Sequence, residues 1–83
     1  PPSRVRSYTR PSAKPALRKF GDNVRSRREA QDLSQEQLAE RADLDRTYIS
    51  GVERGVRNLS LISVVRIAKA LKTSASELCE GVS

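Results

Sequence analysis

The chain has 83 residues and a formal net charge of +6, with one cysteine and no histidine. This length suits one small domain with a modest aliphatic core. Without histidine there is no Ser–His or Cys–His catalytic pair and no histidine metal ligand, and one cysteine can build neither an internal disulfide nor a thiolate zinc site. The sequence therefore predicts a protein that is not an enzyme and that uses no metal or cofactor.

The positive charge is concentrated at the N-terminus. Residues 1–19 hold six basic side chains and no acidic one, whereas residues 20–83 hold ten of each. Residues 1–15 also contain four prolines, so we expect an extended basic arm there rather than a helix. Such an arm suits a polyanion, nucleic acid ahead of a membrane surface, or is a plain solubilising tail. If it contacts DNA, its cations are Arg4, Arg6, Arg10 and Lys14.

The first predicted helix covers residues 16–31. Its apolar side chains Leu17, Phe20 and Val24 follow the spacing of one buried helix face. Gly21 interrupts this helix at a cost of up to about 1 kcal/mol relative to alanine, which close packing against another element would explain. No alternating strand pattern occurs anywhere, so we expect an all-α domain over residues 16–83.

Four further helices are predicted from a recurring N-cap pattern. The capping residues are Ser34, Asp45, Ser60 and Ser74. They start helices over 34–42, from 45, over 60–71 and over 74–80. The helix over 60–71 has more apolar side chains than one stripe needs, so we expect it at the centre of the core. In the last helix, Ala75, Leu78 and Val82 are expected to cover either the core or a partner subunit.

Residues 44–58 are the stretch with the clearest chemistry. Its polar side chains share one face of a helical wheel: Arg46, Thr47, Ser50 and Arg54. Ile49 and Val52 lie on the opposite face, where they can dock on a core. Guanidinium and hydroxyl groups bind base edges and phosphates, although an ordinary solvated helix surface has the same appearance. Gly55 suits the left-handed position just past a helix end.

Two neighbouring stretches complete a recognisable motif, LSQEQLAERA over 33–42 and an apolar helix ending AKAL over 68–71. With them, residues 20–78 resemble a Cro/cI-type helix-turn-helix domain of the xenobiotic-response-element family. The string LDRTYISGVERG, with Arg57-Asn58 after it, most resembles controller proteins of restriction–modification systems. The resemblance implies a compact five-helix, lambda-repressor-like domain with a central helix-turn-helix over 16–83, preceded by the arm over 1–15.

The resemblance also implies a role for each matching side chain. The residues expected to face base edges in the major groove are Arg46, Thr47 and Ser50. Those expected at the DNA backbone are Gln35, Tyr48, Arg54, Arg57, Asn58 and Arg28. An ion pair between Arg28 and Glu53 is expected to orient the recognition helix.

Four positions depart from the pattern of this family. Asp43 and Lys72 stand where glycine is usual, and Asp43 is expected to tolerate the left-handed region with some strain. Leu59 replaces a usual proline, which would loosen its loop. Arg27 replaces an apolar residue, which would leave part of the first helix polar.

The sequence thus predicts a regulator of transcription that binds double-stranded DNA at a pseudo-palindromic operator. A homodimer would present two recognition helices about one DNA turn apart, with the last helix (Ala75, Leu78 and Val82) as the expected dimer surface. We expect it at the DNA of the bacterial cytoplasm, with no membrane span and no small-molecule site. The alternative is a protein-interaction module, antitoxin-like or coactivator-bridging, in which the helix-turn-helix is mainly a scaffold.

Overall fold

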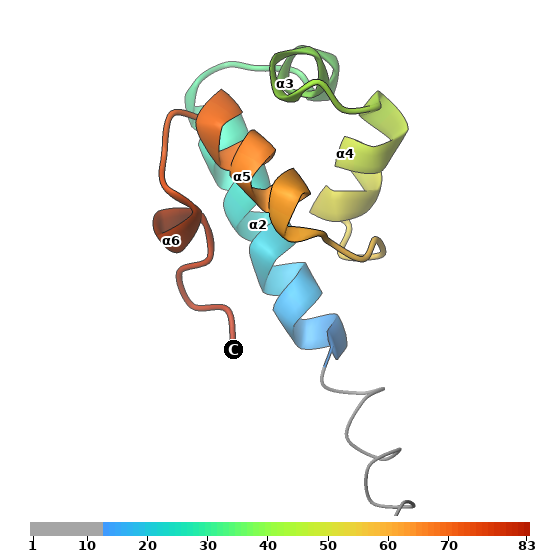
Figure 1. Cartoon of the computed structure of the whole chain (residues 1–83), viewed down its shortest axis with the longest axis vertical. Helices are drawn as coiled ribbons and strands as arrows, with labels where there is room; N and C mark the ends of the chain where they lie inside the picture. Colours follow the sequence, from blue (N-terminus) through green and yellow to red (C-terminus); the bar gives the residue numbers. More distant parts are fainter. Residues whose placement is uncertain (1–12) are drawn as a thin grey trace, which may run out of the picture.

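The computed structural model describes residues 13–83, which form a single all-helical bundle (Figure 1). Its elements are α2 (Ala13–Ala30), α3 (Gln35–Ala42), α4 (Arg46–Glu53), α5 (Leu61–Ala70) and α6 (Ala75–Leu78). The predicted all-α fold with five helices is confirmed. Arg4, Arg6 and Arg10 of the predicted arm lie outside the described residues. Among residues 13–83, no helix combines the length and apolar character needed to cross a bilayer.

Helix α2 begins at Ala13, three residues earlier than the sequence indicated. The difference arises at Pro15, which was expected to exclude a helix. Proline is tolerated in the first turn, where the missing N–H has no partner within the helix. Lys14 therefore lies exposed on the first turn of α2.

The same helix carries the predicted buried face. Phe20 is 2% and Val24 is 0% exposed, so both belong to the core. Gly21 lies where α2 meets α4: a Cβ at this position would overlap the carbonyl oxygen of Val52 and lie 2.7 Å from that of Glu53. The close packing that a glycine in this helix required is thus with the last turn of α4.

All four predicted N-caps are present. The Ser34 and Ser74 hydroxyls accept from the backbone N–H three residues on and form capping boxes with Gln37 and Glu77. Asp45 and Ser60 cap α4 and α5 through their side-chain oxygens. At α6, hydrogen bonds from the Thr73 hydroxyl and the Ser74 backbone N–H lower the pKa of Glu77. These caps fix where α3, α4, α5 and α6 start, and therefore where the loop before each of these helices ends.

Several helices are followed, within two residues of their last helical residue, by a residue in the left-handed region. These residues are Asp32, Asp43, Gly55 and Lys72, with φ of 56°, 57°, 74° and 58°. After α3, the N–H of Leu44 donates to the carbonyl of Ala39 at 2.9 Å, which closes the chain in the geometry of a Schellman motif. The left-handed turn expected at Asp43 is therefore confirmed, and Lys72 adopts the same conformation in place of glycine.

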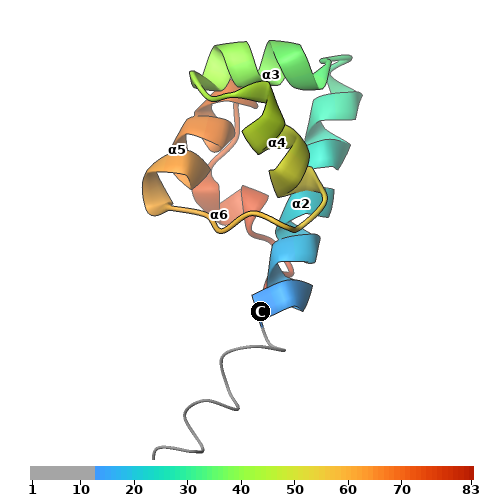
Figure 2. The same ribbon diagram turned by 90° about the vertical axis from the view of Figure 1, so that its right-hand side faces the viewer.

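The helices surround one core (Figures 1 and 2). In Figure 2, α3 crosses the top of the bundle, α4 lies in front of α2, and α5 lies on the far side of the core from α2. The side chains with at most 1% exposure come from all of these helices and from the segments next to them: Val24, Leu38, Ile49, Ile67, Leu71 and Leu78. The helix-turn-helix of α3 and α4 is therefore held from behind by α2 and α5.

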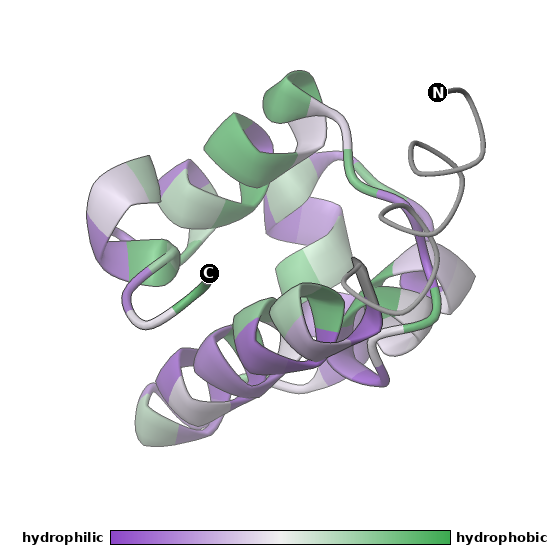
Figure 3. Cartoon of the chain, turned by 90° about the horizontal axis from the view of Figure 1, so that it is seen from below, coloured by the Kyte–Doolittle hydropathy of each residue, from purple (hydrophilic) through white to green (hydrophobic). Residues whose placement is uncertain are grey.

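One expectation about the C-terminal helices is corrected, and an alternative left open for the last helix is decided. The sequence placed α5 at the centre of the core, but its N-terminal half is exposed: Leu61 is 77%, Ile62 66% and Val65 38% exposed. The first turns of α5 accordingly appear as a hydrophobic edge of the bundle (Figure 3). Conversely, Leu78 of α6 is 0% exposed, and Val82 packs against the core. The excess apolar surface belongs to α5, and the last helix covers this chain's own core.

Candidate nucleic-acid interface

Helix α4 presents two opposite faces, as its helical wheel predicts. Ile49 is 0% and Val52 2% exposed, and both face the core. Arg46 and Thr47 are exposed, and Ser50 is half-buried at the margin of the same outer face. The three side chains predicted to face base edges are therefore together on one accessible surface.

The C-terminal end of α4 brings together three of the six predicted backbone-contacting residues. Arg54 is the C-cap, and Gly55 turns the chain so that the N–H of Val56 donates to the carbonyl of Gly51 at 3.0 Å. This turn leaves Arg54, Arg57 and Asn58 exposed beside the helix end. Their guanidinium and amide groups have the donors that phosphate oxygens accept.

Tyr48 links α4 to this loop. Its hydroxyl donates to the carbonyl of Asn58 at 3.2 Å, and the guanidinium carbon of Arg57 lies 5.8 Å from the centre of its ring. This distance is at the outer limit of a cation–π contact. The phenol is half-buried, so it is engaged mainly with its own chain.

The predicted ion pair between Arg28 and Glu53 is present and is the main polar contact behind the recognition helix. Arg28 donates from Nε to Glu53 Oε2 at 2.6 Å and from Nη2 to Oε1 at 3.0 Å. The two side chains are 12% and 4% exposed. Hydrogen bonding to the carboxylate raises the pKa of Arg28, although burial acts in the opposite direction. The pair joins α4 to α2 through two hydrogen bonds.

Two further contacts extend this pair to α3. Arg28 Nη1 donates to the carbonyl of Leu33 at 2.8 Å, and Gln35 Nε2 donates to Glu53 Oε1 at 3.1 Å. Gln35, predicted at a phosphate, thus uses one of its two amide hydrogens inside the protein. Arg28 is mostly buried behind α4 and Gln35 is half-buried at the start of α3, whereas Arg54, Arg57 and Asn58 are exposed.

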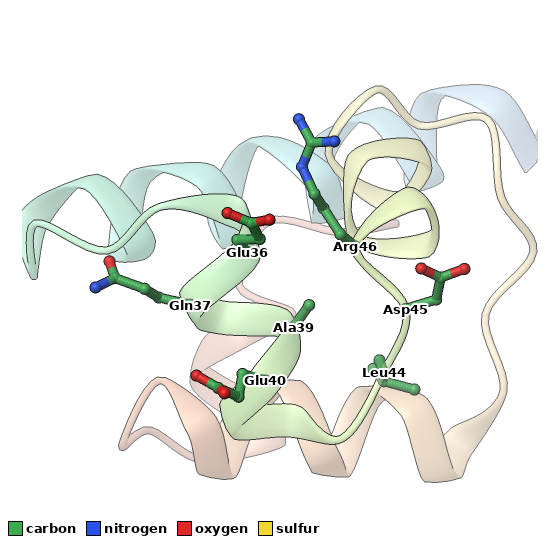
Figure 4. A pocket seen from close by; sticks show the side chains of 7 residues that line it. All are labelled: Glu36, Gln37, Ala39, Glu40, Leu44, Asp45 and Arg46. Carbon is green, nitrogen blue, oxygen red and sulfur yellow. The ribbon is translucent and has the colours of Figure 1, made fainter.

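A shallow cleft of about 500 Å³ opens where α3 meets the start of α4 (Figure 4). It is lined by Glu36, Gln37, Ala39, Glu40, Leu44, Asp45 and Arg46. Glu36 and Arg46 project on the same side of this cleft. Because its lining has three carboxylates and one guanidinium, the cleft disfavours an anion such as phosphate. Glu36 is not among the predicted site residues, although it stands within the LSQEQLAERA motif.

A family model described as helix-turn-helix matches residues 24–78, more than half of the chain. The chain belongs to this helix-turn-helix family. The matched segment includes the last turns of α2 and all of α3 to α6, so the whole scaffold of the site is within it.

Individual members of the family are closely similar. The chain is 54% identical over 59 residues to control protein C.SmaI of Serratia marcescens, spanning 71% of this chain and 70% of that protein. The restriction–modification controller protein C.AhdI of Aeromonas hydrophila superposes with a TM-score of 0.73 at 50% identity, covering 75% of this chain and 94% of that one. The C.Esp1396I tetramer, solved in complex with its natural 35 base-pair operator, gives 0.73 at 39% identity, covering 81% and 88%. The predicted resemblance to controller proteins is confirmed.

Proposed function

We propose that this chain is a sequence-specific regulator of transcription that binds double-stranded DNA through α4 and the loop after it. The observation that carries the proposal is the division of α4 into a buried apolar face and an exposed face with Arg46, Thr47 and Ser50. The operator-bound C.Esp1396I tetramer has the same fold, which supports placing α4 in the major groove. This kinship favours DNA binding over the alternative of a protein-interaction module.

The exposed side chains divide the work of binding. Arg46, Thr47 and Ser50 read base edges, and Arg46 has the fork of donors that matches guanine O6 and N7. Arg54, Arg57 and Asn58 bind the sugar–phosphate backbone and supply affinity that does not depend on sequence. Tyr48 and Gln35 complete the backbone contacts from the edges of this surface.

Arg28 acts mainly from behind this surface. Three of its five N–H donors are taken by Glu53 and the Leu33 carbonyl. Its side chain is only 12% exposed, so a phosphate has little access to the remaining donors. We therefore give Arg28 and Glu53 the role of orienting α4, with backbone contact by Arg28 as a minor part.

Two copies of the chain bind together, through α5 rather than α6. Leu61, Ile62 and Val65 form an exposed apolar surface on α5, whereas Leu78 is already buried in this chain's core. A second copy that covers this surface removes it from water and pairs two recognition helices. A two-fold pair predicts a pseudo-palindromic operator with half-sites about one DNA turn apart.

The protein acts by binding, without catalysis, at DNA in the bacterial cytoplasm. The helix-turn-helix relatives are regulators rather than enzymes, which supports a role without catalysis. Lys14 and the cations Arg4, Arg6 and Arg10 add an electrostatic contribution that weakens as salt increases.

The decisive experiment begins with selection of duplexes from random DNA by the full chain. On the selected duplex, Arg46→Ala should lower discrimination at one base pair per half-site by about 1–3 kcal/mol, measured by fluorescence anisotropy against single-base variants. Arg25→Ala is the matched control, because it removes an exposed arginine that pairs with Glu29 on α2. It should leave the base preference unchanged.

Two outcomes would count against the proposal. If Arg46→Ala weakens binding to selected and random duplexes equally, Arg46 does not read a base. If the unaltered chain fails to discriminate between duplexes even at low salt, the protein-interaction alternative is favoured.

A further inference from the structure

Gly51 lies in the middle of α4 and is buried, and the position of its missing side chain is nearest to the loop after α4. The three atoms nearest to a Cβ built there all belong to Arg57. Such a Cβ would overlap Arg57 Cγ and lie 3.1 Å from Nε and 3.3 Å from Cδ. The Arg57 side chain therefore lies directly against the backbone of Gly51. We call the space over Gly51 that this side chain occupies the Arg57 slot.

Tyr48 forms the side of this slot. It precedes Gly51 by three residues, so the two lie on neighbouring parts of one helix face. The Tyr48 ring centre is 5.8 Å from the Arg57 guanidinium carbon, and its hydroxyl holds the carbonyl of Asn58 at 3.2 Å. The backbone on either side of Arg57 is thus tied to α4, at Asn58 by this hydrogen bond and at Val56 by its bond to the Gly51 carbonyl.

The slot lies at the edge of the exposed face of α4 that carries Arg46, Thr47 and Ser50, the proposed base-reading face. On a helical wheel, Gly51 lies about 140° from Arg46, between Thr47 at about 100° and Tyr48 at about 200°. Arg57 belongs to the loop after α4, but its side chain folds back to this edge. Its guanidinium carbon lies 5.8 Å from the centre of the Tyr48 ring.

We propose that Gly51 is a positioning residue for DNA binding: its missing side chain makes a slot that presents the Arg57 guanidinium to one phosphate beside the reading face. This inference rests on the proposed function. A long arginine side chain in a loop normally loses rotamer freedom when it binds. Because the slot already restricts Arg57, less freedom is lost on binding, and the phosphate contact is stronger.

The position of Arg57 can be tested without DNA. In the unaltered protein, nuclear Overhauser effects are expected between the Gly51 α protons and the Arg57 side-chain methylenes. Their absence would overturn the inference, whatever the protein binds. This measurement separates failure of the slot from failure of the proposed function.

The consequence for binding is tested with Gly51→Ala, Arg57→Ala and the double variant, on the duplex selected by the unaltered chain. Alanine favours a helix more than glycine does, so Gly51→Ala should keep or raise the melting temperature. It should nevertheless weaken binding roughly tenfold, as expected for one charged hydrogen bond, and lower the salt-dependence slope by about one.

In the Arg57→Ala background, adding Gly51→Ala should change the dissociation constant by less than about twofold, because both changes remove the same contact. Independent, multiplying losses would overturn the inference, since the added methyl group would then act on the helix itself. Unchanged affinity of Gly51→Ala alongside a weakened Arg57→Ala would overturn it too. Failure of the unaltered chain to select any duplex would instead refute the proposed function.

Discussion

At the scale of single residues, Asp43 has an unusual backbone conformation. It has φ of 57° and ψ of 46°, in the region where a side chain crowds the backbone and glycine does not. The turn between α3 and α4 needs this conformation, because the Schellman hydrogen bonds at the end of α3 close through it. The protein therefore tolerates local strain at the turn that sets the angle of the recognition helix.

Replacing Asp43 with glycine should relieve this strain. We expect Asp43→Gly to raise the free energy of unfolding by about 0.5–1 kcal/mol, with part of the gain offset by the greater freedom of glycine in the unfolded chain. Asp43→Ala is the control, because alanine keeps a Cβ and lacks aspartate's tolerance of this region. Urea denaturation measures both. Equal stability of the glycine and alanine variants would show that backbone strain is not the cause.

At the scale of the elements, the ion pair of Arg28 and Glu53 joins α2 to α4, and Gln35 brings in α3. Removing one partner of a pair this buried leaves the other charge without compensation. We expect Glu53→Ala to lower the free energy of unfolding by about 3 kcal/mol, measured by urea denaturation. The exposed pair of Arg25 and Glu29 is the control, since its side chains are 63% and 57% exposed.

In that control, Glu29→Ala should cost less than about 1 kcal/mol. Replacing both members of the buried pair with leucine should recover part of the loss, because no buried charge then remains. If Glu53→Ala proves as mild as Glu29→Ala, the pair does not hold α4 in place.

Much of this element-scale description was available from the sequence. The caps at Ser34, Asp45, Ser60 and Ser74 depend on local hydrogen bonds, and local patterns identify them well. The start of α2 was predicted too late in the chain, because Pro15 was expected to exclude a helix. Proline disrupts the interior of a helix but is tolerated in its first turn. Gln35 and Gly51 were not predictable in detail, since their contacts with Glu53 and Arg57 exist only after separate segments pack together.

At the scale of the whole molecule, burial also corrected a prediction. Hydrophobic periodicity identifies apolar side chains but not whether this chain or another copy covers them. On α5 the inner side chains Ile67 and Ala68 are buried, while Leu61 and Ile62 remain exposed. Leu78 on α6 shows the reverse, because it fills a place in this chain's own core, one of the two alternatives that the sequence left open.

The exposed apolar surface of α5 is the proposed dimer surface, so a charge placed on it should separate the two copies. Ile62→Glu should convert the dimer to a monomer in sedimentation velocity, because a carboxylate there would be buried without a partner. Operator affinity should fall with it, since two half-sites are no longer bound together. The control is Ser76→Glu at an exposed position of α6, and it should leave the dimer intact. Dissociation by Ser76→Glu alone would return the dimer surface to α6.

The two faces of α4 have a consequence for how such regulators diversify. Ile49 and Val52 anchor the helix from the inside, while Arg46 and Thr47 contribute little to the core. Under the proposed function, substitutions on the outer face would alter the preferred DNA sequence at little cost in folding. A lineage of these proteins would then acquire new operators one base pair at a time, with the scaffold unchanged. The same separation makes α4 a convenient site for engineered operator preference.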